Sequence, residues 1–197
     1  MSLKLSEPEK FLLQNYSKYY ELYQIEGEIN AKIKGVFEGL EADFRDQGWW
    51  DDRLRFYLGG DRFGIWSPEW TAQKKSVEDY NKTAGIWFQN CCVEDIFLPA
   101  ASQKPYFNVW TSRLSSDKCP LASLNQKLQK ISKFNWGIRK KLDLPTCAVA
   151  YRFEPSKGWL KALDDADLLR NELLTETNYL ANAFVDKIFK LTKSLNA

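Results

Sequence analysis

The sequence has 197 residues and contains no histidine. This absence excludes Ser-His-Asp and Cys-His catalysis, histidine acid–base chemistry and every metal site that needs imidazole. The adjacent acidic pairs Asp51–Asp52 and Glu94–Asp95 do not replace it, because neighbouring side chains usually point in different directions. We therefore expect no catalytic residues, no metal ligands and no cofactor, and an enzyme with carboxylate or thiol chemistry is the least favoured alternative.

Cysteine is scarce, and its spacing does not resemble a disulfide framework. The four cysteines are Cys91, Cys92, Cys119 and Cys147. We interpret them as reduced, buried structural thiols in a cytoplasmic protein. No apolar run reaches the ~18 residues that cross a membrane, and residues 1–10 contain no apolar run of secretory length. We accordingly expect no membrane association.

Neither sign of charge dominates. The chain has 28 basic and 26 acidic residues and a net charge of +2, which is too small to hold polyanions through a global field. A glycine-rich phosphate loop is also lacking, since Gly59–Gly60 is followed by the acidic Asp61. A role with nucleic acid would need a local basic patch.

Apolar and aromatic residues are plentiful. They make up 44% and 15% of the chain, which is enough to build a sizeable core. The length fits one domain. We expect residues 1–197 to form a single α+β domain.

The two ends of the chain have helical periodicity. Ser6 and Glu9 form a capping box, and apolar residues then recur at steps of three and four, which predicts a helix over approximately 7–46. About 40 residues would span ~60 Å, so this helix must kink, near Gly27 or Gly35, or project from the body. The same spacing predicts a helix over approximately 170–196. Pairing in coiled-coil fashion would hide both apolar stripes, and we expect dimerisation through these helices.

The region between them, approximately 53–153, has the period of two typical of strands. Gly59–Gly60 marks a hairpin, and Cys119–Pro120 opens one inserted helix. Short connections favour antiparallel pairing. The sequence thus predicts an α+β fold, with an antiparallel sheet of four to five strands, long N- and C-terminal amphipathic helices and one inserted helix.

The outward-facing positions of the predicted strands are unusually aromatic. One interpretation is that helices cover this face as a third layer. The other is an open surface that binds a peptide, a partner protein or stacked bases, because aromatic side chains are enriched at binding sites. The candidate binding residues are Tyr57, Trp66, Trp87, Tyr106 and Trp110.

A basic segment, residues 127–141, contains no acidic residue. It is either a solvated helix face or a surface that follows a phosphate backbone. An acidic counterpart could neutralise it, within the fold or across a dimer; its members are Asp164, Asp165, Asp167, Glu172 and Glu176. The candidate nucleic-acid-binding residues are Lys127, Lys130, Lys133, Trp136, Arg139, Lys140 and Lys141.

These observations favour a non-enzymatic binding or assembly module. We expect it to act through the aromatic sheet face or the terminal helix pair, with a protein partner or by self-association. Nucleic-acid binding by residues 127–141 is the alternative.

Overall fold

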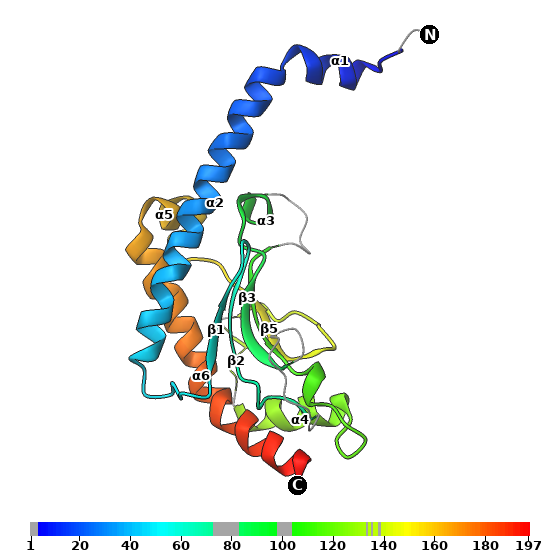
Figure 1. Ribbon diagram of the computed structural model, residues 1–197, viewed down its shortest axis with the longest axis vertical. Helices are drawn as coiled ribbons and strands as arrows, with labels where there is room; N and C mark the ends of the chain where they lie inside the picture. The colour runs from blue at the N-terminus through cyan, green and yellow to red at the C-terminus, as the bar shows by residue number, and fades with distance from the viewer. Residues whose placement is uncertain (1–3, 73–82, 98–103, 133, 135, 138) are drawn as a thin grey trace.

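The computed structural model describes residues 4–72, 83–97, 104–132, 134, 136, 137 and 139–197. It contains the antiparallel sheet and the long terminal helices that the sequence predicts (Figure 1). The helices are α1 (Glu7–Gln14), α2 (Tyr16–Arg45), α3 (Val93–Phe97), α4 (Leu121–Ser132), α5 (Trp159–Asp164) and α6 (Ala166–Asn196), with a 3-10 turn, η3 (Ser112–Leu114). The strands are β1 (Arg55–Leu58), β2 (Phe63–Trp66), β3 (Gly85–Gln89), β4 (Tyr106–Trp110) and β5 (Cys147–Arg152).

The sheet has five strands in the order of the sequence, and each strand is antiparallel to the next. Because side chains alternate along a strand, the register sorts them into an inner and an outer face. One inner row consists of Phe56, Ile65, Ile86, Val109 and Val149, and a second of Leu58, Phe63, Phe88, Phe107 and Tyr151.

The C-terminal part of α2 and the length of α6 cover the inner face, side by side (Figure 1). The ring of Phe37 on α2 lies 5.3 Å from that of Phe63. Between the helices, Arg170 forms an ion pair with Asp43 at 2.6 Å. The two terminal helices therefore pack on each other and on the sheet.

The first predicted helix is broken, but the expected position of the break was wrong. α2 runs through Gly27 and Gly35 without interruption, and the break lies at Asn15, which has φ −113° and ψ 18°. The side chain of Asn15 donates a hydrogen bond to the carbonyl of Phe11 at 2.9 Å. Such a local bond competes with the helical backbone pattern, whereas a glycine only lowers helix propensity.

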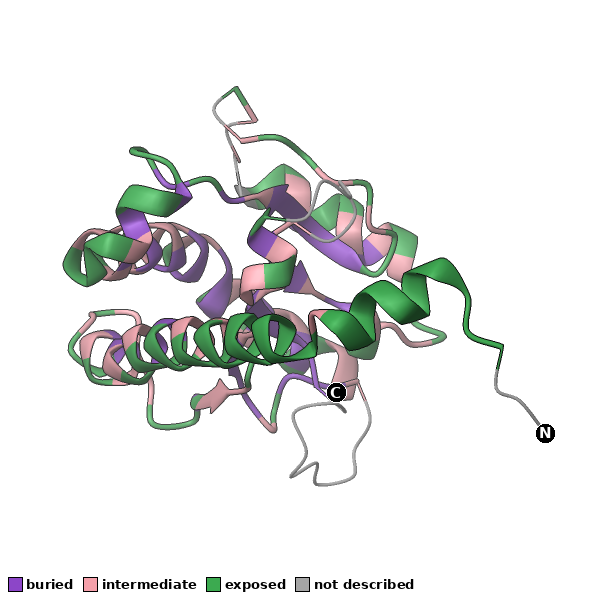
Figure 2. Ribbon diagram, turned by 90° about the horizontal axis from the view of Figure 1, so that it is seen from above, coloured by how far each residue is buried: buried purple, intermediate pink, exposed green. Residues whose placement is uncertain are grey.

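The N-terminal helical segment also projects from the body. We call residues 7–28, which comprise α1 and the first part of α2, the arm. Its residues are almost all exposed (Figure 2). Phe11, Leu22 and Tyr23 are 68%, 66% and 63% exposed. In contrast, Ile33, Phe37, Leu40 and Phe44 on the same helix are buried.

Two glycines let an indole lie flat on the outer face of the sheet. A Cβ at Gly64 would lie 2.1 Å from the Cε3 of Trp87, and one at Gly85 would lie 2.2 Å from its Nε1. Both distances are too short for any real contact. The indole thus occupies the space that side chains at these two positions would otherwise fill.

We expect Gly64→Ala to lower the free energy of unfolding by about 1–3 kcal/mol, because the added methyl group overpacks this site. Urea unfolding measures the change, and Gly60→Ala is the control, since nothing lies within 4 Å of a Cβ there. In the background Trp87→Val the cost should largely disappear. An equal cost with and without the indole would contradict this packing.

Candidate functional site

The structure brings part of the predicted aromatic face together in one cavity. Trp87, Tyr106 and Trp110 line a pocket of about 300 Å³ on the outer face of the sheet. We call it the outer-face pocket. Its other lining residues are Arg62, Gln89, Asn108, Leu144, Thr146 and Cys147.

The other two aromatic candidates lie outside this lining. Tyr57 packs against Trp87, with ring centroids 5.7 Å apart, and Trp66 is 9% exposed. The long helices α2 and α6 lie on the opposite face of the sheet, so they do not form a third layer over these residues.

The polar groups of the outer-face pocket leave it close to neutral. Arg62 binds the carboxylate of Asp61 through two hydrogen bonds of 2.8 and 2.9 Å. Burial raises the pKa of the Cys147 thiol to about 11 and also raises the pKa of Tyr106. The hydroxyl of Tyr106 donates to the Oε1 of Gln89 at 2.8 Å.

Asn108 is the lining residue that the sequence did not single out. It is 2% exposed, and its Oδ1 has no hydrogen-bond partner among the described residues. A polar residue at an outward-facing strand position is ordinary in a sequence. Its burial in a pocket depends on the neighbouring strands and on residues 144–147, so the sequence carried no signal for it.

The basic segment is distributed over two elements. Lys127 and Lys130 are exposed on α4, while Lys140 and Lys141 are exposed beside β5. Lys133 lies outside the described residues. The ammonium group of Lys141 lies 5.4 Å from the ring centroid of Trp136. Nucleic-acid binding by this segment stays a prediction.

Arg139 has a structural partner within the chain. Its guanidinium donates to Glu176 at 3.0 and 3.1 Å and lies 4.2 Å from the ring centroid of Tyr179. The hydroxyl of Tyr151 donates to the same carboxylate at 2.6 Å. Burial, and then the charge of Glu176, raises the pKa of Tyr151. Of the expected neutralisation of the basic segment, the structure therefore shows one pair, Arg139 with Glu176.

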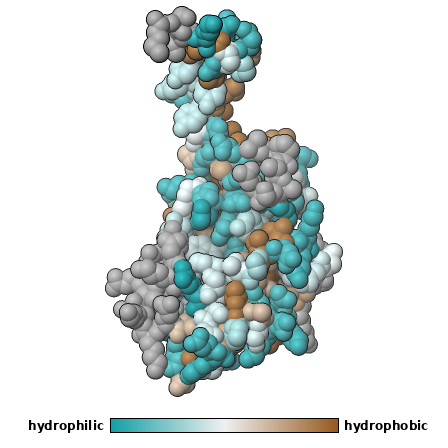
Figure 3. Space-filling view, turned by 90° about the vertical axis from the view of Figure 1, so that its right-hand side faces the viewer, coloured by the Kyte–Doolittle hydropathy of each residue, from teal (hydrophilic) through white to brown (hydrophobic). Residues whose placement is uncertain are grey.

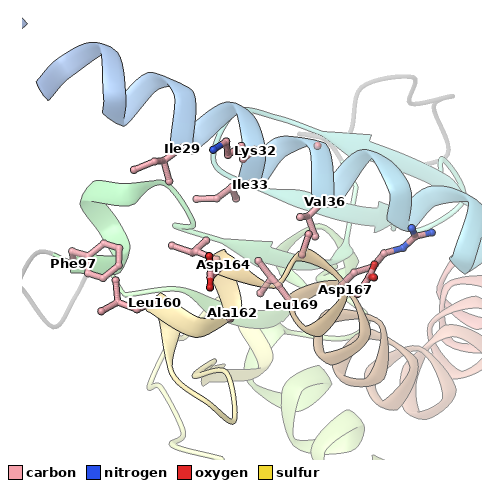
Figure 4. A pocket seen from close by; sticks show the side chains of 14 residues that line it. Ile29, Lys32, Ile33, Val36, Phe97, Leu160, Ala162, Asp164, Asp167 and Leu169 are labelled. Atoms are coloured by element: carbon pink, nitrogen blue, oxygen red, sulfur yellow. The ribbon is translucent and has the colours of Figure 1, made fainter. Parts of the chain in front are cut away.

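An apolar groove lies where the arm joins the body. It has a volume of about 710 Å³ and lies between α2, α3, α5 and α6 (Figure 4). Ile29 and Val36 of α2 lie along one side of it, Leu160 of α5 lies on the other side, and Phe97 of α3 lies at one end. Leu160 is 75% exposed and Phe97 is 46% exposed. The charged side chains Lys32, Asp164 and Asp167 also line the groove.

All four cysteines are free thiols, and three of them are buried. Burial raises the pKa of Cys91, and it raises that of Cys92 to about 11. The thiols of Cys91 and Cys92 are therefore poor nucleophiles near neutral pH.

The part of the chain that the structure describes offers no group of three His, Cys, Asp or Glu side chains able to hold a metal ion. No helix within the described ranges is long and apolar enough to cross a membrane.

No family model, curated protein or solved structure matches the chain. The surfaces that bear on function are the arm, the groove at its base and the outer-face pocket.

Proposed function

We propose that this chain is a non-enzymatic assembly module that self-associates through its arm. The observation that carries the proposal is the set of large apolar and aromatic side chains exposed on α1 and the first part of α2. Figure 3 shows hydrophobic atoms on this projecting part among hydrophilic ones. A high density of exposed large apolar side chains usually marks an interaction site. The members of this set are Phe11, Leu12, Leu13, Tyr16, Tyr19, Tyr20, Leu22, Tyr23 and Ile25.

The size of the arm favours a second copy of the chain as its partner. One face of a helix that is about 10 Å wide and 30 Å long offers only a few hundred Å², and a stable interface needs roughly 800 Å² per partner. We infer that the two arms pack antiparallel, so that each arm approaches the groove at the base of the other. A two-fold pair thus uses the arm and the groove of both copies at once.

In this arrangement, charged side chains on the arm of one copy face side chains of opposite charge on the arm of the other copy. A two-fold axis between Tyr19 and Tyr20 places Lys18 of one copy opposite Glu21 of the other, and it does so twice. Opposite charges at such rim positions favour the correct register and orientation.

Sedimentation equilibrium tests this proposal. We expect the chain to form a dimer of twice its 23.0 kDa mass. Ile25→Glu should raise the dissociation constant at least about tenfold, because a charge would enter an apolar contact at a cost above about 1.4 kcal/mol. Ile131→Glu is the matched control: Ile131 lies on α4, away from the arm, and both isoleucines are 51% exposed.

The outcome that overturns self-association is equally direct. A chain that stays monomeric up to about 1 mM has less than about 4 kcal/mol of dimerisation free energy. The arm would then bind a different protein. An equal loss of association in Ile25→Glu and Ile131→Glu would also contradict the proposed interface.

A further inference from the structure

The outer-face pocket has the properties of a small ligand site. We propose that it binds the ring of an uncharged planar heterocycle, and that an adenine base fits its chemistry best. This inference is independent of self-association, because the pocket and the arm share no residue.

The walls of the pocket favour a flat ring. Trp87 on β3 and Tyr106 and Trp110 on β4 all line the pocket. Trp87 is 2% exposed, whereas Tyr106 and Trp110 are half-buried. The position of the Trp87 indole is fixed by its close approach to Gly64 and Gly85. Bases stack on aromatic side chains of this kind with little dependence on sequence, because every base has a π-face.

Asn108 gives the pocket its directional polar contact. A carboxamide has an acceptor and a donor side by side, and the N6 amino group and N7 of adenine form the complementary pair. The buried Oδ1 of Asn108 has no partner within the described chain, and an unpaired buried acceptor is unfavourable. A ligand that donates to this oxygen would relieve that cost.

The charge and the volume of the pocket further restrict the kind of ligand that it can bind. The guanidinium of Arg62 is already neutralised by Asp61, and the thiol of Cys147 stays protonated near pH 7 because its pKa is about 11. The pocket therefore offers no strong site for a phosphate. Its volume of about 300 Å³ lies at the lower end for ligand sites, which suits one base rather than a dinucleotide.

Calorimetric titration of the whole chain with adenosine tests the proposal. Purine riboside, which lacks only the 6-amino group, is the matched ligand. We expect adenosine to bind. Purine riboside should bind at least about tenfold more weakly, because it lacks the amino group that donates to Asn108.

The variant Asn108→Leu separates a binding role from a structural one. We expect adenosine to bind it at least about tenfold more weakly, while its melting temperature stays the same or rises, because an unpaired buried amide has been removed. Asn182→Leu, on the exposed surface of α6, should change neither property.

Two results would overturn the proposal. One is a titration with adenosine up to about 10 mM that shows neither heat nor saturation. The binding free energy would then be smaller than about 3 kcal/mol in magnitude. The other is equal affinity of Asn108→Leu and the unaltered chain. If Asn108→Leu does not fold, Trp110→Leu, at a half-buried wall position, provides the same comparison: retained affinity contradicts the site, and lost affinity supports it.

Discussion

Replacing Phe37 with alanine is expected to lower the free energy of unfolding by about 3–5 kcal/mol, the usual cost of removing a buried aromatic ring. Phe37 is 1% exposed. Its ring lies 5.3 Å from that of Phe63 and 6.0 Å from that of Phe88, so it joins α2 to the centre of the sheet. Apolar rings surround the site, so water would find no polar partner in the cavity that the lost ring leaves.

The control for Phe37→Ala is Tyr20→Ala on the same helix. Tyr20 is 52% exposed on the arm, and we expect its replacement to change the stability of the body by less than about 0.5 kcal/mol. Both changes should be made in the Ile25→Glu background, so that self-association does not contribute to the apparent stability. If Phe37→Ala and Tyr20→Ala lower the free energy of unfolding by comparable amounts, the arm would belong to the folded body, contrary to the structure.

Glu176→Gln is expected to cost about 3 kcal/mol of unfolding free energy, because it leaves the guanidinium of Arg139 without its counter-charge. The side chains of Arg139 and Glu176 are 13% and 23% exposed. Solvent therefore replaces little of the lost interaction. The hydroxyl of Tyr151 also donates to this carboxylate, so a charge-assisted hydrogen bond weakens at the same time.

The matched control for Glu176→Gln is Asp186→Asn, an exposed carboxylate further along α6, which should be nearly neutral. The double variant Arg139→Met with Glu176→Leu should recover most of the stability, because apolar residues can replace a buried pair when both charges are removed together. Guanidinium would screen the pair, so urea is the suitable denaturant. A cost below about 1 kcal/mol for Glu176→Gln would show that Arg139 is solvated instead.

The sequence predicted the fold class because local patterns carry it. Alternation with a period of two placed the sheet at approximately 53–153, with four to five strands expected and five present, and spacing of three and four located the terminal helices. α3 was missed, since its five residues, Val93–Phe97, are too few to show a helical period. The break at Asn15 was missed because it depends on one side chain bonding to the carbonyl of Phe11.

The candidate surfaces were less predictable. The apolar spacing of the first helix is the same before and after Ile29, so it cannot tell the exposed arm from the half that covers the sheet. Opposite charges suggested neutralisation of the basic segment, but the choice of Glu176 for Arg139 depends on how β5 and α6 meet. The burial of Asn108 likewise depends on the packing of residues that are distant in the sequence.

The arm and the end of α6 lie at opposite extremes of the molecule (Figure 1). The last turn of α6 is held to the body, because the side chain of Asn196 donates to the carbonyl of Thr71 at 3.1 Å. In an antiparallel pair, the two C-terminal ends would accordingly lie at the far tips of an elongated rod. Any cargo fused there would be kept apart by the full length of both copies, so the pair would work as a spacer.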